Sequence, residues 1–514
     1  MGGPHRARSV LMGTPVREDT RLSLWRRVRA YAVPPTMIET ATARRLAGDW
    51  AGACAAARVD LDLTPRTLAR THGTELAARV RADLRRLAPD LLRWHLPRTA
   101  PDGLLRPGTT VTLAVYPDHE APGTRAQRPA RPVHLVARTA PAWADAGQRI
   151  SLALWDGPPA DPPPRRWSAY DPAAAHPHPH PSRRFRLDLH RHLWDATRAG
   201  ELRTRSGADL LPAVPAAPDD PPGPGWAVDR WAAEARLLLA AEGRTAGPVL
   251  VRLGSGQRLL LTPEPDGRAR TEPVPAGRGR HGPPDDPAGR PWPAVLPDAA
   301  TWTPPDLALL RAGLVTPGEL HPLVAEALTP GGRNGTGTRP GGPGDGPTFV
   351  DCRGSRHRIG LVDGVLVPLD HDPAELRREE LLVALSGTPL PCLRAIDAAH
   401  RTPDSLTDVR ERLAHGDTAG AFAVVEGLLG SGAVLRDGPL RDALERAAER
   451  KVLHGLYRSG LRATGPEDVP EPPPTPDPGQ GHGPVHRPRG TWFGAREARR
   501  ALGHRDHPRH ALAR

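Results

Sequence analysis

The stretch RLAGDWAGACAAA at residues 45–57 has the pattern of two short helices joined by a tight turn. Glycine readily adopts the left-handed conformation that ends many helices, so Gly48 is expected to terminate the first helix. Asp49 is then expected to cap the second helix through its carboxylate. The small residues that follow allow two helices to approach closely. The stretch therefore predicts an αα-hairpin.

The same pattern recurs near the other end of the chain as RLAHGDTAGAFAVV at residues 412–425, with Asp417 as the expected cap. Tetratricopeptide-type and related helical hairpins use small residues in this way. Two copies so far apart do not make an array, because stacked repeats need at least three units. True repetition and chance convergence of Ala/Gly-rich hairpins both remain open.

Around these hairpins the period of the apolar residues changes along the chain. Helical spacing runs through Leu76, Val80, Leu84, Leu87 and Leu91, which predicts a buried helical stripe. Short runs rich in Val, Leu, Ile and Thr, including VLVRLGSGQRLLL at 249–261, predict strands and hairpins. With 64 proline and 53 glycine residues in clusters, the predicted fold class is α+β: mainly helical blocks of αα-hairpins with small antiparallel β elements, separated by disordered Pro/Gly linkers.

The expected organisation alternates folded blocks with linkers. The folded blocks are a helical N-terminal block at 20–100, a small antiparallel sheet at 101–155, a mixed α/β block at 183–262, short helices at 301–329, and a β-hairpin plus helical C-terminal block at 348–463. The linkers are 156–182, 263–300, 330–347 and 464–490, and the ends are a basic flexible N-terminus at 1–19 and a basic tail at 491–514.

The charge of the chain is concentrated at its two ends. The formal net charge is +12, and Lys451 is the sole lysine, so the basic residues are almost all arginine. Residues 1–30 carry +5 and residues 485–514 carry +6, which leaves +1 for the body. A strongly basic protein can bind nucleic acid through its positive charge. This charge distribution makes such binding less expected for the body of the chain and leaves it open for the tails.

Cysteine usage and hydropathy indicate a cytoplasmic protein. Cys54, Cys352 and Cys392 are far apart in the sequence, and we expect neither a disulfide framework nor a zinc ligand set from them. The sequence has no apolar run long enough for a membrane span and no signal peptide pattern. No cofactor and no metal is expected.

The residues 351–372 are the best candidate for a catalytic region. Cys352, His357 and Asp370 are the thiol, base and acid that nucleophilic catalysis requires. Five residues around a tight turn could, however, leave Cys352 and His357 on opposite faces. The run Asp370-His371-Asp372 could ligate a metal, but Asp372 before Pro373 is better explained as a helix N-cap.

Two further sets of polar residues are candidate binding residues. His176, His178 and His180 alternate with proline, and a polyproline II helix with three residues per turn does not place them on one face. Arginines flank aromatic residues at both ends of the chain, which suits weak, sequence-independent contact with nucleic acid. These candidates are Arg26, Arg27, Arg29, Arg496, Arg499 and Arg500.

In composition, the chain resembles uncharacterised Ala/Arg/Pro-rich proteins of high-GC actinobacteria. The resemblance is carried by the stretches AVPPTMIETATARRLAGDW at 32–50, APDLLRWHLPR at 88–98 and VDCRGSRHRIGLVDGVLVPLDHDPAELRREELL at 350–382. The resemblance implies a lineage and no activity. From the residues alone, the leading hypothesis is a non-enzymatic protein-interaction or scaffold protein with an unknown protein partner. Whether the chain is an enzyme stays open, although the residues favour a non-enzymatic role. The alternatives are an enzyme that uses Cys352, His357 and Asp370, or nucleic-acid association through the tails.

Overall fold

The computed structural model describes residues 16–117, 132–157, 180–210, 225–253, 257–274, 293–330, 348–352, 354–386 and 390–459. The chain divides into two compact units. The described part of the first unit covers most of residues 16–330, and that of the second is built mainly from residues 348–459. The fold class is α+β, as predicted from the sequence. No helix in these described ranges is both long enough and apolar enough to cross a membrane.

The first unit begins with a run of helices whose starts follow from proline and threonine. Proline occupies the first turn of α3, α5 and α7, where its missing N–H costs nothing, and Thr64 caps α5. The helices are α2 (Val16–Arg27) with a π turn at Val28–Ala32, α3 (Pro35–Leu46), α4 (Trp50–Ala56), α5 (Pro65–His72), α6 (Thr74–Arg86) and α7 (Pro89–His95).

The predicted stripe of leucines is buried, but it spans two helices. Leu76, Val80, Leu84, Leu87 and Leu91 are all at most 7% exposed. The helix breaks at residues 87–88, because the residue before a proline disfavours the helical conformation and Leu87 forms a β-bridge with Asp195.

The first sheet confirms the three strands expected within 101–155 and adds a fourth. β2 (Thr110–Tyr116), β3 (Val133–Thr139) and β4 (Ile150–Trp155) form an antiparallel meander. β1 (Val59–Leu61) pairs parallel with β4, which gives the order β1-β4-β3-β2. Three residues are too few for the sequence pattern to have identified β1.

One core joins segments that the sequence divides into separate blocks. The same hydrophobic cluster includes Leu22, Val80, Leu113, Leu152 and Leu328, so the blocks 20–100, 101–155 and 301–329 share their interior. Short elements of residues 191–210 complete this part of the unit: 3-10 turns at Arg191–Leu193, Ala199–Glu201 and Ala208–Leu210 and α8 (Leu202–Ser206). The helices α11 (Pro305–Arg311) and α12 (Pro322–Leu328) also belong to it.

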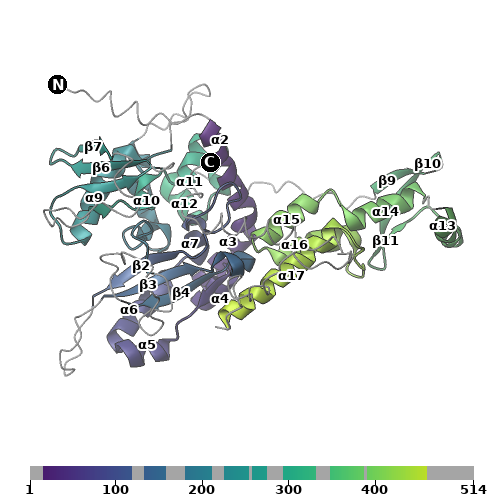
Figure 1. The fold of residues 1–514 in the computed structure, drawn as a ribbon, viewed down its shortest axis with the longest axis horizontal. Helices are drawn as coiled ribbons and strands as arrows, with labels where there is room; N and C mark the ends of the chain where they lie inside the picture. Colours follow the sequence, from purple (N-terminus) through teal and green to yellow (C-terminus); the bar gives the residue numbers. More distant parts are fainter. Residues whose placement is uncertain are drawn as a thin grey trace, which may run out of the picture. The chain divides into compact units, whose positions relative to one another are not determined.

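A second, smaller sheet of the first unit packs against α9 (Val228–Ala241). β5 (Val249–Arg252) and β6 (Arg258–Pro263) form the predicted hairpin. β7 (Ala269–Pro273), β8 (Ala294–Val295) and α10 (Asp298–Thr301) lie inside the stretch expected to be a linker at 263–300. The strand order is β7-β6-β5-β8. Figure 1 shows β6 and β7 beside α9.

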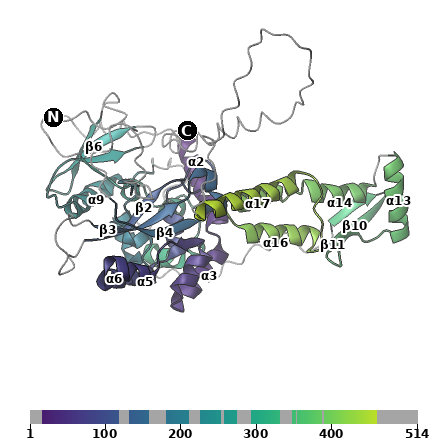
Figure 2. The ribbon, with the colours of Figure 1, turned by 60° about the horizontal axis from the view of Figure 1, so that its bottom comes forward.

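The second unit joins a three-stranded sheet to a set of helices. β9 (Thr348–Cys352), β10 (Ser355–Val362) and β11 (Val365–Pro368) form an antiparallel meander in the order β11-β10-β9. The helices are α13 (Pro373–Ser386), α14 (Pro391–Arg401), α15 (Leu406–Ala414), α16 (Thr418–Leu429) and α17 (Pro439–Arg458). The sheet contacts α14 (Figure 2). The helices α15–α17 share a separate apolar core.

Both predicted αα-hairpins are confirmed. Gly48 and Gly416 have positive φ angles of 77° and 83°, and Asp49 and Asp417 cap α4 and α16 through backbone N–H groups. The glycine three residues after each aspartate has a different role from the one expected. A β-carbon at Gly52 would lie 2.1 Å from an oxygen of Asp49, so this glycine makes room for the capping carboxylate rather than for a neighbouring helix.

Most of the expected linkers and tails lie outside the described residues. This holds for nearly all of 156–182 and 330–347, for 464–490, for 491–514 and for residues 1–15. The turn Gly254-Ser255-Gly256 between β5 and β6 also lies outside them.

Candidate functional site

Two cysteines and a histidine meet where the sheet of the second unit contacts α14. Cys352 is the last residue of β9, Cys392 lies in the first turn of α14, and His371 follows β11. Their ligand atoms, two Sγ atoms and a ring nitrogen, all lie within 4.8 Å of one another. This differs from the expectation that the cysteines are too far apart for a ligand set, because the packing of α14 on the sheet closes a sequence separation of 40 residues.

The strand register places His357 on the same side of the sheet as Cys352. Cys352 is paired with Ser355, and alternate residues of a strand share a face, so Ser355 and His357 face the same way as Cys352. Cys352 and Ile359 on this face are buried. Pro368, which is paired with Ile359 on the neighbouring strand, is also buried. The tight turn therefore brings the thiol and the imidazole to one face instead of separating them.

His371 is held between two neighbours and leaves one nitrogen unsatisfied. Its Nδ1 lies 3.8 Å from a carboxylate oxygen of Glu375, and its side chain is 3% exposed. Its ring stacks on His357, with the ring centroids 4.2 Å apart and the planes at 25°. The buried Nε2 of His371 has no hydrogen-bond partner, and neither does the buried Nδ1 of His357.

Cys352 and Cys392 are both fully buried. Burial raises the pKa of Cys392 to about 11, and the hydrogen bond and charge of Cys352 and the charge of Asp370 add to this rise. A buried thiol whose pKa is raised is a poorer nucleophile than a free cysteine.

The acid of the expected catalytic set is bound to an arginine. The guanidinium and the backbone N–H of Arg358 both donate to the Asp370 carboxylate, at 2.7 Å and 2.8 Å. These hydrogen bonds lower the pKa of Asp370 to about 2. No hydrogen bond joins Cys352, His357 and Asp370 to one another within the described part of the chain. Asp372 accepts from the backbone N–H of Ala374 at 3.0 Å, as expected of a cap before Pro373.

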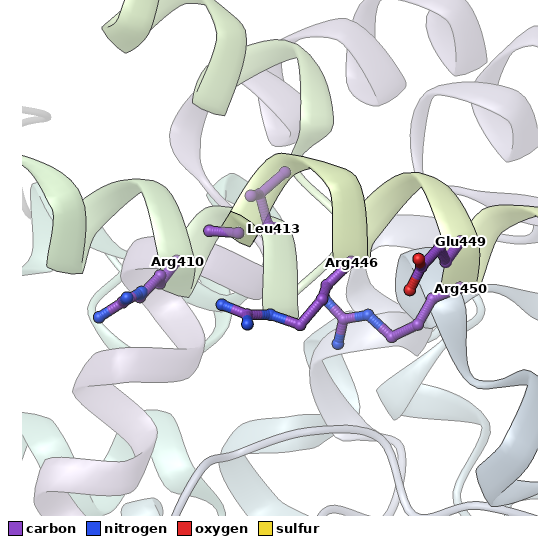
Figure 3. A pocket seen from close by; sticks show the side chains of 6 residues that line it. Arg410, Leu413, Arg446, Glu449 and Arg450 are labelled. Atoms are coloured by element: carbon purple, nitrogen blue, oxygen red, sulfur yellow. The ribbon is translucent and has the colours of Figure 1, made fainter. Parts of the chain in front are cut away.

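A second candidate site is an arginine-lined groove of about 440 Å³ between α15 and α17. Leu413 and Ala443, both buried, form its apolar lining. Arg410 comes from α15, and Arg446 and Arg450 lie one turn apart on α17 (Figure 3). Among the described residues that line this groove, Glu449 is the one acidic residue. The sequence reasoning missed it, although the i, i+4 spacing of Arg446 and Arg450 gives a signal of a basic helix face.

The three groove arginines differ from other arginines of the second unit. The guanidinium of Arg412 contacts Asp408 and Asp417, and that of Arg441 contacts Asp437 and Glu445. Among the described residues, no carboxylate lies within ion-pair distance of Arg410, Arg446 or Arg450. The buried Nε of Arg450 has no hydrogen-bond partner. The groove therefore holds three cationic groups and one anionic group, and its positive charge is not neutralised by ion pairs.

The N-terminal nucleic-acid candidates are partly used within the fold. Arg29 donates to the backbone oxygen of Glu319 and lies 3.4 Å from Asp306, and Arg27 lies 3.8 Å from Asp102. Arg26 is exposed. Trp25 is no free stacking platform, because its ring packs against Trp94 at 5.2 Å. Arg496, Arg499 and Arg500 lie outside the described residues, as do His176 and His178.

Two buried polar pairs of the first unit have structural roles. The Nε2 of His321 lies 2.9 Å from Asp90, and its Nδ1 accepts from the backbone N–H of Leu323, so His321 caps α12. Glu234 receives two hydrogen bonds from Arg205. Each of these groups has its partner within the fold, and they therefore favour stability over catalysis.

No protein-family model, no curated protein and no solved structure matches this chain. The geometry of the two candidate sites therefore carries the functional argument.

Proposed function

We propose that the protein is a non-enzymatic interaction protein whose second unit binds an acidic segment of a partner protein. The observation that carries the proposal is the groove between α15 and α17, where three arginines without carboxylate partners surround an apolar lining. Leu413 and Ala443 supply contact area, and Arg410, Arg446 and Arg450 supply donors for carboxylates. A cytoplasmic location belongs to this proposal, since none of the three cysteines forms a disulfide.

Charge complementarity determines the chemistry of the partner. A guanidinium offers a planar fork of donors that matches a carboxylate in a bidentate geometry. A segment rich in Asp and Glu would neutralise the excess positive charge of the groove and satisfy the unpartnered Nε of Arg450. The apolar lining offers contact to the methylene groups of glutamate side chains in such a segment.

An enzymatic function has less support from the same residues. Asp370 is engaged by Arg358 through side-chain and backbone hydrogen bonds, and within the described part of the chain no hydrogen bond joins it to Cys352 or His357. The residues around Cys352 and His357 therefore favour a structural role over a catalytic one.

Fluorescence anisotropy with a labelled polyglutamate peptide tests the groove. The full chain should bind this peptide, and affinity should fall with rising salt because the contacts are ionic. In the variant R410E/R446E both changes are at exposed positions of the groove, so the fold should persist. Loss of two charge-assisted contacts should weaken binding by about tenfold or more.

The matched control is R378E/R441E, which changes the net charge equally. Arg378 is exposed on α13, and Arg441 lies on α17 with its guanidinium already paired. This variant should bind polyglutamate with nearly the affinity of the unmodified chain. Equal weakening by both variants would show a nonspecific charge effect and contradict the proposal. Tighter binding of a single-stranded oligonucleotide than of polyglutamate, lost in R410E/R446E, would assign the groove to nucleic acid instead.

A further inference from the structure

The cluster of Cys352, His371 and Cys392 supplies three of the four ligands of a structural zinc site. We propose that these three residues bind a zinc ion that fastens the β9–β11 sheet to α14. Thiolate sulfur and imidazole nitrogen are the ligands of structural zinc sites in proteins. Each ligand comes from a different element, namely the end of β9, the segment after β11 and the first turn of α14. One ion would therefore join three parts of the second unit.

The spacing of the ligand atoms is close to that of a tetrahedral site. With Zn–S near 2.3 Å and Zn–N near 2.0 Å, ligand atoms of a tetrahedral site lie roughly 3.5–3.8 Å apart. The three atoms lie within 4.8 Å of one another. The largest separation therefore exceeds the tetrahedral spacing by about 1 Å.

His371 is oriented as a metal ligand. A metal-bound histidine usually directs its second ring nitrogen to a carboxylate, which fixes the ring and raises its basicity. Glu375 lies 3.8 Å from Nδ1 of His371, and Nε2 is buried without a hydrogen-bond partner. An unsatisfied buried nitrogen is costly, and a zinc ion between Nε2 and the two sulfur atoms would remove that cost.

A disulfide between Cys352 and Cys392 would explain less of the geometry. Oxidation would join the two sulfur atoms and leave Nε2 of His371 buried without a partner. An iron–sulfur cluster is also disfavoured, since such clusters are usually held by four cysteine thiolates. Two thiolates and an imidazole among the described ligands suit zinc better than either alternative.

The small core around the sheet gives the ion a structural role. On β10, Ile359 is the one buried residue among eight, and on β9 only Cys352 is buried. The local apolar cluster consists of Cys352, Leu390 and Cys392, with Val350 and Leu393 against it. So little apolar burial gives a small sheet marginal stability, and a bound metal commonly compensates for a small core.

The first experiment measures metal content and cobalt spectra of the full-length protein. The chain is purified with a phosphine reductant and zinc, and metal is determined by mass spectrometry. We expect about one zinc ion per chain, as for a single site of this type. Replacement of zinc by Co²⁺ should give the visible d–d bands of a tetrahedral site and a thiolate-to-cobalt charge-transfer band.

Variants of the three proposed ligands are compared with a control variant of Cys54, a buried cysteine that is not a proposed ligand. C352S, C392S and H371A should each lose the bound zinc and the thiolate–cobalt band. C54A should keep both, because Cys54 lies buried in α4 of the first unit. E375Q should retain the ion with roughly tenfold weaker affinity, because carboxylates behind a ligating histidine tune affinity to this extent. H357A should also retain it, since His357 stacks on His371 without being one of the three ligands.

A chelation cycle covers the case in which a ligand variant fails to fold. Chelator treatment of the unmodified chain should increase proteolysis within residues 348–401, and added Zn²⁺ should restore protection while Mg²⁺ should not. Metal-free protein under reducing conditions, zinc retained in both C352S and C392S, or iron with sulfide in place of zinc would each overturn the proposal. Complete loss of zinc in H357A would overturn the assignment of three ligands.

Discussion

Asp417 and Gly420 fit together at the start of α16. The Asp417 carboxylate accepts a hydrogen bond from the Gly420 backbone N–H at 3.3 Å. A β-carbon at position 420 would lie 2.1 Å from one oxygen of this carboxylate and 2.9 Å from Nη1 of Arg412. The cap, its ion pair with Arg412 and the glycine therefore depend on one another. Asp49 and Gly52 repeat the arrangement at α4.

Alanine at position 420 should therefore weaken the hairpin, whereas alanine at position 427 should not. Gly427 lies in the same helix, and its β-carbon would meet no atom within 4 Å. G427A should stabilise the protein by about 0.5–1 kcal/mol, as alanine does in helix interiors. G420A displaces the capping carboxylate and should be less stable than G427A by about 1–2 kcal/mol. Urea denaturation followed by circular dichroism compares them, and equal stabilities would contradict the cap argument.

The core of the first unit makes a second prediction, at Leu84. This residue of α6 is 2% exposed inside the main hydrophobic cluster. L84D would bury a carboxylate with no partner and should destabilise the unit by several kcal/mol. Leu46, at the end of α3, is 75% exposed, and L46D should change stability by less than about 0.5 kcal/mol. If the two variants unfold at the same urea concentration, Leu84 does not belong to the core.

These examples show why local features could be predicted from the sequence. Gly48, Asp49, Gly416 and Asp417 act within one turn of the chain, so residue identity alone determines the helix end and the cap. The role of Gly420 was misjudged because it depends on the rotamer of Asp417, which the sequence does not contain.

Contacts between distant segments could not be predicted in the same way. Cys392 meets Cys352 because α14 packs on the β9–β11 sheet, and no rule of spacing links the two residues. β1 pairs with β4 across roughly 90 residues of sequence. The catalytic set was drawn from residues close in sequence, and the packing instead joined Cys352 to a cysteine 40 positions away.

Buried histidines of the first unit should make it sensitive to acid. Burial lowers the pKa of His95 to about 4 and that of His190 to about 3, with nearby arginines adding to both shifts. The unfolded chain, with histidine pKa values near 6.5, then binds more protons than the folded chain. Stability is fully present above pH 6.5 and is lost progressively as the pH falls toward these lower values.

Each such histidine should lower the free energy of unfolding by about 1.4 kcal/mol when the pH falls from 7.5 to 5.5. H95Q removes one titrating group, so its stability should fall less steeply over this interval than that of the unmodified chain. H72Q changes a histidine at the end of α5 and should leave the slope unchanged. Urea midpoints at the two pH values provide the comparison. A slope that H95Q leaves unaltered would show that His95 is not buried in its neutral form.

Replacement by alanine should lower the stability of the first unit at Arg29 but leave it nearly unchanged at Arg26, three residues away. The guanidinium of Arg29 lies 5.0 Å above the ring of Trp94 and contacts Asp306, whose side chain is 1% exposed. R29A should therefore destabilise the first unit by roughly 2–3 kcal/mol, since it removes a charged partner of a buried carboxylate. Arg26 is exposed, and R26A should alter stability by less than about 0.5 kcal/mol.

The same pair tests the expectation of nucleic-acid association through the ends of the chain. Any contact with phosphates at this end should involve Arg26, because Arg29 is already bound within the fold. Affinity for a single-stranded oligonucleotide should be weak, fall with salt and decrease in R26A. It should be unchanged in R29A under conditions where that variant remains folded. A larger effect of R29A than of R26A on folded protein would show that the Arg29 guanidinium leaves Asp306 to bind phosphate.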